Sequence, residues 1–191
     1  MRVALLDRDG TINVKAPEDD YVKRPQDVTL IDGSAAAVRL LNVTGVRVAV
    51  VSNQRGIARG KMTESDLVAV NNQIAHILSA CDAHVDLWLH CPHETSSCTC
   101  RKPLPGMLLE ALARLDGDAS HSAMFGDSYH DVAAGRAAGV WTVRIAAARD
   151  PAANATASSL QRAVEGWLGL GPATSRAVPS VPLGAPVCHS E

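Results

Sequence analysis

Apolar residues gather in short runs that alternate with longer segments along most of the chain. The short runs, rich in Val, Leu and Ile, predict buried strands, and the longer segments are typical of helices. We expect strands over 2–6, 46–51, 85–89, 122–125 and 140–145, and helices over 33–41, 63–80, 105–115 and 130–138. This alternation favours an α/β fold with a parallel sheet flanked by helices on both faces.

The length and composition set the size of that fold. With 191 residues the chain can build one domain with a substantial core, which we expect over residues 1–168. Hydrophobic residues make up 47% but aromatic residues only 3%, so Val, Leu, Ile and Ala must form the core. Residues 169–191 are rich in Pro, Gly, Ser and Ala without periodicity, which predicts a disordered tail.

Charge and hydrophobicity restrict the partners. A net charge of −2 argues against a general nucleic-acid surface, which needs a basic excess. Apolar runs fall short of a membrane span, and the first residues lack the apolar stretch of a signal peptide. We therefore expect a cytoplasmic monomer that acts on a small molecule, with neither nucleic acid nor membrane as partner.

Acids and hydroxyls stand where three of the predicted strands end. Asp7 and Asp9 follow the first strand, Ser52 and Asn53 follow the second, and Asp127 follows a later one. Because ligands of open α/β sheets bind outside the carboxyl ends of the strands, these side chains should meet at one edge. Carboxylates crowded together need a cation, and Mg²⁺ is the natural one because it prefers hard oxygen ligands.

These residues suit phosphoryl transfer. One aspartate can take up the phosphoryl group as an aspartyl phosphate, and the other can give a proton to the leaving alkoxide and later take one from water. The Ser52 hydroxyl and the Lys102 ammonium can stabilise the charge on the transferring oxygens. The alternative is that Asp7 and Asp9 only form a turn before Gly10, but it leaves Ser52 and Lys102 unexplained.

A second group of metal-ligand residues lies in the segment CPHETSSCTC, residues 91–100, here called the zinc loop. Its candidate ligands are Cys91, His93, Cys98 and Cys100. Three sulfurs and one imidazole suit a closed tetrahedral Zn²⁺ site, and four protein ligands leave no open position for catalysis. The zinc is therefore expected to be structural, holding the adjoining Arg101 and Lys102 over the phosphate site.

The motifs DRDGT, SNQRGIARG, CRKP and GDSYHD, in this order, resemble those of the haloacid dehalogenase (HAD) superfamily of phosphatases. More narrowly, they resemble its histidinol-phosphate and heptose-bisphosphate phosphatase branch, which often carries a zinc loop of the type Cys-x-His…Cys-x-Cys. The resemblance extends over roughly residues 2–146. It implies a Rossmann-like HAD fold.

The resemblance also implies a role for each matched residue. Asp7 would be the nucleophile and Asp9 the general acid and base. Ser52 and Lys102 would bind the phosphoryl group. Mg²⁺ would be held by Asp7, by Asp127 and by the backbone carbonyl of Asp9.

Many HAD phosphatases carry a cap domain, but the segments between the motifs of this chain leave no room for one. We expect an open site whose specificity is set by residues 14–24, residues 54–60 and the zinc loop. Gly56 and Gly60 predict a turn that lets the backbone approach the ligand. Further substrate contacts are expected from Asp20, Tyr21, Asn53, Gln54 and Arg101.

The resemblance points to heptose 1,7-bisphosphate as the substrate, with loss of the C7 phosphate. Another sugar phosphate stays open, because Ser128 follows Asp127 where the heptose enzymes often have lysine. Histidinol phosphate is an alternative, for which Glu18, Asp19 and Asp20 offer an acidic patch. An alternative of another class is a non-catalytic zinc-binding scaffold on the same fold, against which the intact acids argue.

Overall fold

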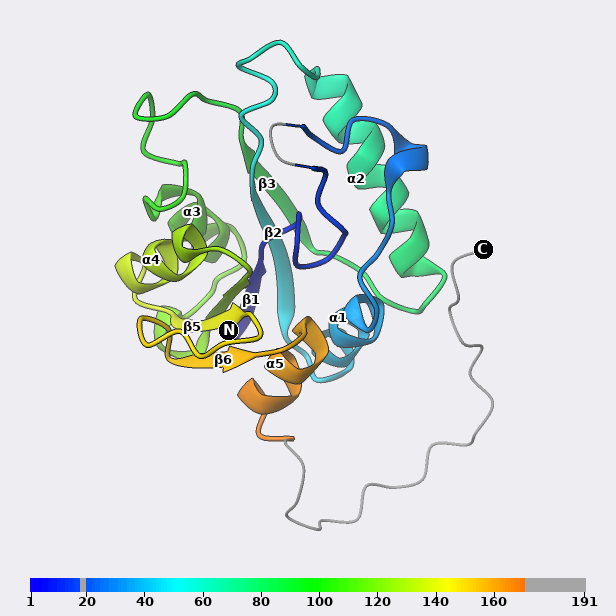
Figure 1. Cartoon of the computed structure of the whole chain (residues 1–191). Coiled ribbons are helices and arrows are strands. Elements are labelled where there is room, and N and C mark those ends of the chain that lie inside the picture. Colours follow the sequence, from blue (N-terminus) through cyan, green and yellow to red (C-terminus); the bar gives the residue numbers. More distant parts are fainter. Residues whose placement is uncertain (18–19, 171–191) are drawn as a thin grey trace.

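A computed structural model describes residues 1–17 and 20–170 of the chain. Six parallel strands form one sheet in the order β3-β2-β1-β4-β5-β6 (Figure 1). Their bounds are β1 Val3–Leu6, β2 Arg47–Asn53, β3 Leu87–Cys91, β4 Ala123–Gly126, β5 Trp141–Ile145 and β6 Ala155–Ala157. The predicted Rossmann-like α/β fold is confirmed, since this strand order is that of a doubly wound sheet.

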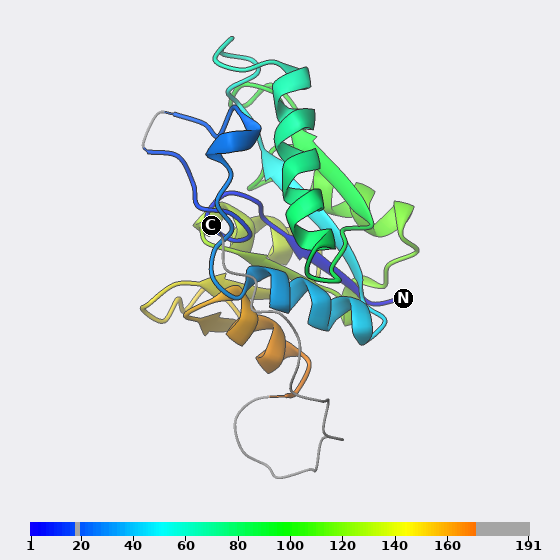
Figure 2. The same ribbon diagram turned by 90° about the vertical axis from the view of Figure 1, so that its right-hand side faces the viewer.

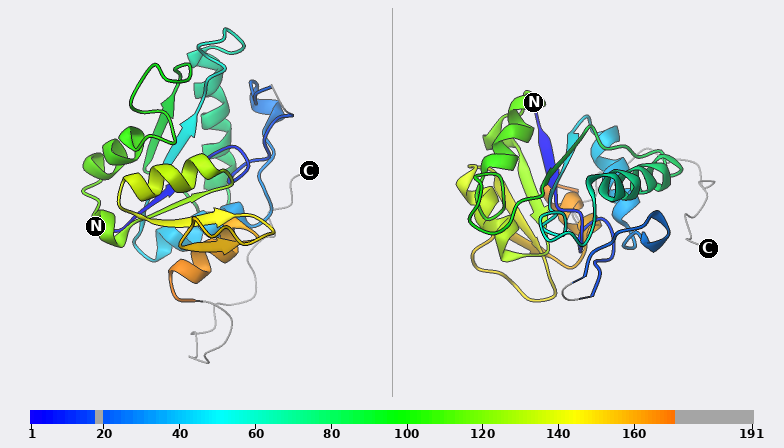
Figure 3. Two further views of the ribbon diagram at one scale, coloured as in Figure 1. Left: turned by 60° about the vertical axis from the view of Figure 1, so that its left-hand side comes forward. Right: turned by 90° about the horizontal axis from the view of Figure 1, so that it is seen from above.

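Helices cover both faces of the sheet, as the alternation predicted. They are α1 Ser34–Val43, α2 Glu64–Ser79, α3 Gly106–Arg114, α4 Tyr129–Ala137 and α5 Leu160–Trp167, with 3₁₀ turns η1 Pro25–Asp27 and η2 Ala119–His121. Figure 2 looks onto the face covered by α1, α2 and α5, and Figure 3 shows α3 and α4 on the opposite face.

The central strand β1 supplies apolar side chains to both layers. Ala4 and Leu6 belong to the core under α1, α2 and α5, whereas Val3 and Leu5 belong to the core under α3 and α4. All four side chains are fully buried, because successive side chains of a strand point to opposite faces. Burial on both sides explains why this strand is a continuous apolar run rather than an alternating one.

The predicted elements lie within a few residues of those observed, and the capping of α2 shows why its start was readable. The Thr63 hydroxyl accepts from the Asp66 backbone N–H at 3.1 Å, and the Asp66 carboxylate accepts from the Thr63 backbone N–H at 2.8 Å. This reciprocal pair satisfies two free donors of the first helical turn. Strand β3 begins and ends two residues later than predicted, so Cys91 is its last residue.

No strand or helix was expected after residue 145, although β6 and α5 lie there. Helix α5 could have been predicted, because its apolar residues recur at helical spacing, at Leu160, Ala163, Val164 and Trp167. The Ser159 hydroxyl caps this helix by accepting from the Arg162 N–H at 3.3 Å. Strand β6 spans only three residues and carries no comparable apolar run.

Within the described residues the connections after β1 and β2 contain loops, η1, α1 and α2 but no inserted cap domain. The loops that follow β1, β2 and β3 project from one end of the sheet, at the top of Figure 1. The helices of the described part are all too short or too polar to cross a membrane. Of the predicted tail, residues 171–191 lie outside the described residues, and the domain boundary at 168 stays a prediction.

Candidate active site

The candidate site lies where β1 and β4 end side by side. Asp7 follows β1 directly, and its backbone N–H donates to the Phe125 carbonyl of β4 at 2.9 Å. Asp127 follows the end of β4. After β1 the chain passes to β2 and β3 on one side of the sheet, and then returns to β4 on the other side. Such a switch in strand order opens a crevice between the two strand ends, which is where ligands of these sheets bind.

Lys102 joins the acids of this crevice. Its ammonium lies 2.8 Å from the Asp7 carboxylate, 2.6 Å from Asp131 and 2.7 Å from the Val51 carbonyl. Only 3% of the Lys102 side chain is exposed. Burial alone would lower the pKa of Lys102, but the carboxylates of Asp7 and Asp131 outweigh it and raise that pKa. The site therefore holds a fixed positive charge, as a phosphoryl group requires.

The carboxylates form a cluster that suits a divalent cation. Oxygens of Asp7, Asp127 and Asp131 lie within 4.8 Å of one another. Burial raises the pKa of Asp7 to about 7, with Lys102 opposing the rise and Asp131 adding to it. A cation beside Asp7 would lower that pKa and keep the carboxylate ionised. The cluster also offers the hard oxygen donors that Mg²⁺ prefers, so it fits the predicted metal.

Gly10 permits this cluster. Its φ is +87°, and a Cβ atom there would lie 2.3 Å from an Asp127 carboxylate oxygen. Any other residue at this position would collide with Asp127 in addition to adopting a strained backbone.

The Asp9 carboxylate is held by a set of donors. The Arg8 guanidinium contacts both of its carboxylate oxygens, at 2.9 and 3.0 Å, and is itself 1% exposed. The Asn13 and Gln54 side-chain amides donate to the same carboxylate at 3.0 and 2.8 Å. These contacts fix the orientation of the Asp9 carboxylate, and its role in proton transfer stays a prediction. Arg8 and Asn13 were not identified from the sequence.

Asn53, the last residue of β2, binds the backbone of Lys102, two residues after the zinc loop. Its side-chain amide donates to the Lys102 carbonyl at 2.9 Å and accepts from the Lys102 backbone N–H at 3.1 Å. Gln54, which is fully buried, also donates to the Ser52 hydroxyl at 2.7 Å. The side chains of Asn53 and Gln54 contact Lys102, Ser52 and Asp9, and their predicted contact with substrate stays a prediction.

The zinc loop brings its predicted ligands together. The His93 Nδ1 atom lies 3.3 Å from Cys100 Sγ and 3.6 Å from Cys91 Sγ. The sulfur of Cys98 lies 3.5 Å from that of Cys91 and 3.4 Å from that of Cys100. A tetrahedral Zn²⁺ with bonds of about 2.0 to 2.3 Å needs ligand atoms about 3.5 to 3.8 Å apart, so the four atoms fit zinc closely.

The zinc loop also contacts the turn after β2. Glu94 pairs with Arg55 at 3.3 Å and with Arg59 at 3.2 Å, so both arginines have a partner within the protein. Arg101, next to the last cysteine, has a buried Nη1 atom without a hydrogen-bond partner among the described residues.

Asp20 and Tyr21 lie in the segment between β1 and α1. Asp20 is paired with Lys23 at 2.8 Å, and of the predicted acidic patch Glu18 and Asp19 lie outside the described residues. Gly56 was predicted to make room for a ligand. A Cβ atom there would instead lie 2.9 Å from the Tyr21 ring, so the small residue makes room for that ring.

Comparison with known proteins agrees with this geometry. A family model for haloacid dehalogenase-like hydrolases matches residues 1–139. The chain is 41% identical over 145 residues to the D-glycero-beta-D-manno-heptose-1,7-bisphosphate 7-phosphatase of Escherichia coli (strain K12), covering 72% of this chain and 74% of the relative. The enzyme of the same name from Pasteurella multocida is 36% identical over 144 residues, covering 72% and 77%.

A solved structure gives the same result. The D,D-heptose 1,7-bisphosphate phosphatase from B. bronchiseptica, complexed with magnesium and phosphate, superposes with a TM-score of 0.81 at 30% identity. The superposition covers 88% of this chain and 99% of that one. The fold and the acidic site thus define a hydrolase of the phosphatase type. The chain belongs to the haloacid dehalogenase-like hydrolase family, as its motifs predicted, and it is similar to heptose-bisphosphate phosphatases within that family.

Proposed function

We propose that this protein is a Mg²⁺-dependent phosphatase that removes the C7 phosphate of D-glycero-D-manno-heptose 1,7-bisphosphate through an aspartyl phosphate. The observation that carries the proposal is the buried ion pair of Lys102 with Asp7 at the switch in strand order. It places a nucleophile beside a cation that can neutralise the incoming phosphoryl oxygens. The names of the relatives supply the sugar.

In the first half-reaction the Asp7 carboxylate attacks phosphorus and the ester P–O bond breaks. Asp9 gives its proton to the leaving sugar oxygen, which departs as the alcohol. Lys102 and the Ser52 hydroxyl stabilise the charge on the transferring oxygens. Arg8, Asn13 and Gln54 keep the Asp9 carboxylate in place for this step.

In the second half-reaction Asp9 takes a proton from a water molecule. That water attacks phosphorus of the aspartyl phosphate, the bond to Asp7 breaks, and inorganic phosphate leaves. Bound Mg²⁺, held by Asp7, Asp127 and the Asp9 carbonyl, would supply positive charge beside the phosphoryl oxygens. Zn²⁺ in the zinc loop would hold Arg101 and Lys102 in place.

Phosphate release from a panel of substrates tests the proposal. The panel contains both anomers of heptose 1,7-bisphosphate, histidinol phosphate and simple hexose phosphates, each with and without Mg²⁺. We expect the heptose bisphosphate to have the highest kcat/KM. A clear preference for histidinol phosphate would overturn the substrate assignment, and absence of release from every ester would favour the non-catalytic scaffold.

We further propose that the protein acts as a cytoplasmic monomer. The expectation rests on the sequence composition and on a site that draws all of its candidate groups from one chain. Light scattering of the purified protein tests the monomer, for which the mass of one chain, 20.1 kDa, is expected.

A further inference from the structure

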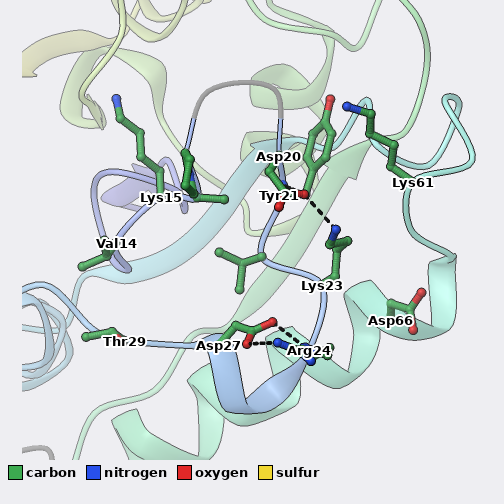
Figure 4. Close-up of a pocket in the computed structure, with 13 residues that line it drawn as sticks. Val14, Lys15, Asp20, Tyr21, Lys23, Arg24, Asp27, Thr29, Lys61 and Asp66 are labelled. Carbon is green, nitrogen blue, oxygen red and sulfur yellow. Dashed lines mark hydrogen bonds and ion pairs between the residues drawn. The ribbon is translucent and has the colours of Figure 1, made fainter.

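A groove of about 650 Å³ opens beside the acidic site, between the segment that follows β1 and the start of α2 (Figure 4). Its charged lining residues are Lys15, Asp20, Lys23, Arg24, Asp27, Lys61 and Asp66. In the mechanism above none of these side chains takes part in the chemistry. The groove therefore needs a separate explanation.

The acids of the groove are all committed to partners within the protein. Asp27 binds Arg24 with two contacts, at 2.7 and 2.8 Å. Asp20 is paired with Lys23 at 2.8 Å. Asp66 caps helix α2. These pairs account for two of the basic residues of the groove, Lys23 and Arg24.

Lys15 differs from the other basic residues because its partner lies in the metal site. Its ammonium is 2.8 Å from an Asp127 carboxylate oxygen, and 65% of its side chain is exposed. The two residues are 112 positions apart in the sequence. Ser128, which follows Asp127, is neutral and donates its hydroxyl to Asp131 at 2.6 Å. The positive charge beside Asp127 is thus supplied by the groove.

Metal binding would change the balance of charge around Lys15. A divalent cation held by Asp7 and Asp127 would neutralise the carboxylate that attracts the ammonium. Lys15 would then offer its positive charge to a ligand at the junction of the groove and the metal site, on a long exposed side chain.

We propose that Lys15 binds the second phosphate of a bisphosphate substrate whose first phosphate lies at Asp7. This inference rests on the proposed function, which makes the substrate a sugar bisphosphate. The sugar would then pass along the groove by Tyr21, whose ring is 6.0 Å from the Lys61 ammonium and is drawn between Lys15 and Lys61 in Figure 4. An ammonium suits a phosphate as a charge-assisted donor.

The test compares two substrates that differ only in the second phosphate, heptose 1,7-bisphosphate and heptose 7-phosphate. In Lys15→Met, we expect kcat/KM for the bisphosphate to fall by roughly 10- to 100-fold, mainly through KM, the range of a lost hydrogen bond between charged groups. For the monophosphate we expect a fall of less than about threefold. Lys15→Arg should keep most of the preference for the bisphosphate.

Arg114→Met is the control. It removes an exposed cation of α3 that is paired with Glu110, outside the groove, so the preference for the bisphosphate should not change. Equal losses on both substrates in Lys15→Met would show that Lys15 acts only on the metal site, and would overturn the proposal.

A binding measurement separates this proposal from the proposed reaction. Calorimetric titration of both sugar phosphates, with Mg²⁺ present, uses the Asp7→Asn protein with and without Lys15→Met. We expect Lys15→Met to weaken binding of the bisphosphate alone. If the wild-type protein releases no phosphate from either sugar, the proposed function fails, yet this selective loss would still support Lys15. Unchanged binding of the bisphosphate would contradict its role.

Discussion

The acidic site and the zinc loop lie at the same end of the sheet but are assembled in opposite ways. Asp7 and Lys102, which share an ion pair, are 95 positions apart, so only the complete sheet brings them together. The zinc ligands all lie within residues 91–100 and can meet through the folding of one loop around a metal. The ion pair of Asp7 and Lys102 thus requires the folded sheet. The position of Lys102 depends in addition on the zinc loop that precedes it.

The two regions meet at one junction. Cys100, the last zinc ligand, is two residues before Lys102. Asn53 of β2 makes two hydrogen bonds with the backbone of Lys102. Changes in the acidic site should abolish chemistry and leave zinc bound. Changes in the zinc loop should lower activity by moving Lys102 while the acids stay in place.

The largest effect is expected for Asp7→Asn. Loss of the nucleophile should lower kcat by roughly four orders of magnitude or more, with zinc content and the circular dichroism spectrum unchanged. The control is Asp82→Asn, an exposed turn residue after α2, which should keep wild-type turnover. Near-wild-type phosphate release from Asp7→Asn would refute the assignment of the nucleophile.

Removal of zinc should come next. Metal analysis of the purified protein should find about one zinc per chain. Cys98→Ser should lose that zinc, and its kcat/KM should fall about 100-fold. The reason is that Arg101 and Lys102, once displaced, bind the phosphoryl group poorly. Added Mg²⁺ should not restore the activity. Ser97→Ala, which removes only a hydroxyl bonded to the Glu94 carbonyl, should retain both zinc and activity.

Gly10→Ala tests how closely the acidic site is packed. The added methyl group would meet Asp127 and strain the backbone, so the Mg²⁺ concentration for half-maximal activity should rise about tenfold. Gly45→Ala carries the same kind of strain, with φ +73° but open space around it. If Gly10→Ala and Gly45→Ala raise the Mg²⁺ concentration for half-maximal activity equally, close packing against Asp127 does not affect metal binding.

The smallest effect is expected for Asn53→Ala, which loosens the junction between the two regions. Activity should fall about three- to tenfold while zinc stays bound. Asn42→Ala is the control, since Asn42 makes the same pair of hydrogen bonds with the backbone of His84, at 3.1 and 2.9 Å. A loss of stability without loss of activity in both variants would show that Asn53 does not position Lys102.

Much of the site could be predicted from the sequence because it is encoded in short motifs. Asp7, Asp9 and the zinc ligands each lie in a segment of about ten residues or fewer, whose spacing carries the chemistry. The parallel sheet then follows from the alternation of strands and helices, and it brings the motif ends to one edge.

What escaped prediction depends on contacts between distant segments. The pairing of Lys15 with Asp127 joins a loop to a strand end, and no local pattern distinguishes Lys15 from other exposed lysines. The roles of Arg8 and Gly56 likewise depend on their neighbours in space, the Asp9 carboxylate and the Tyr21 ring. The missed α5 is different, because its helical repeat could have been read from the sequence.

The most direct test of the account is to trap the phosphorylated enzyme. Protein mixed with Mg²⁺ and heptose 1,7-bisphosphate is quenched in acid within milliseconds, digested, and examined by mass spectrometry. We predict one added phosphoryl group on the peptide that contains Asp7, and none on that peptide in Asp7→Asn. Rapid phosphate release with the group on another residue, or with no phosphorylated peptide at any quench time, would contradict the central claim.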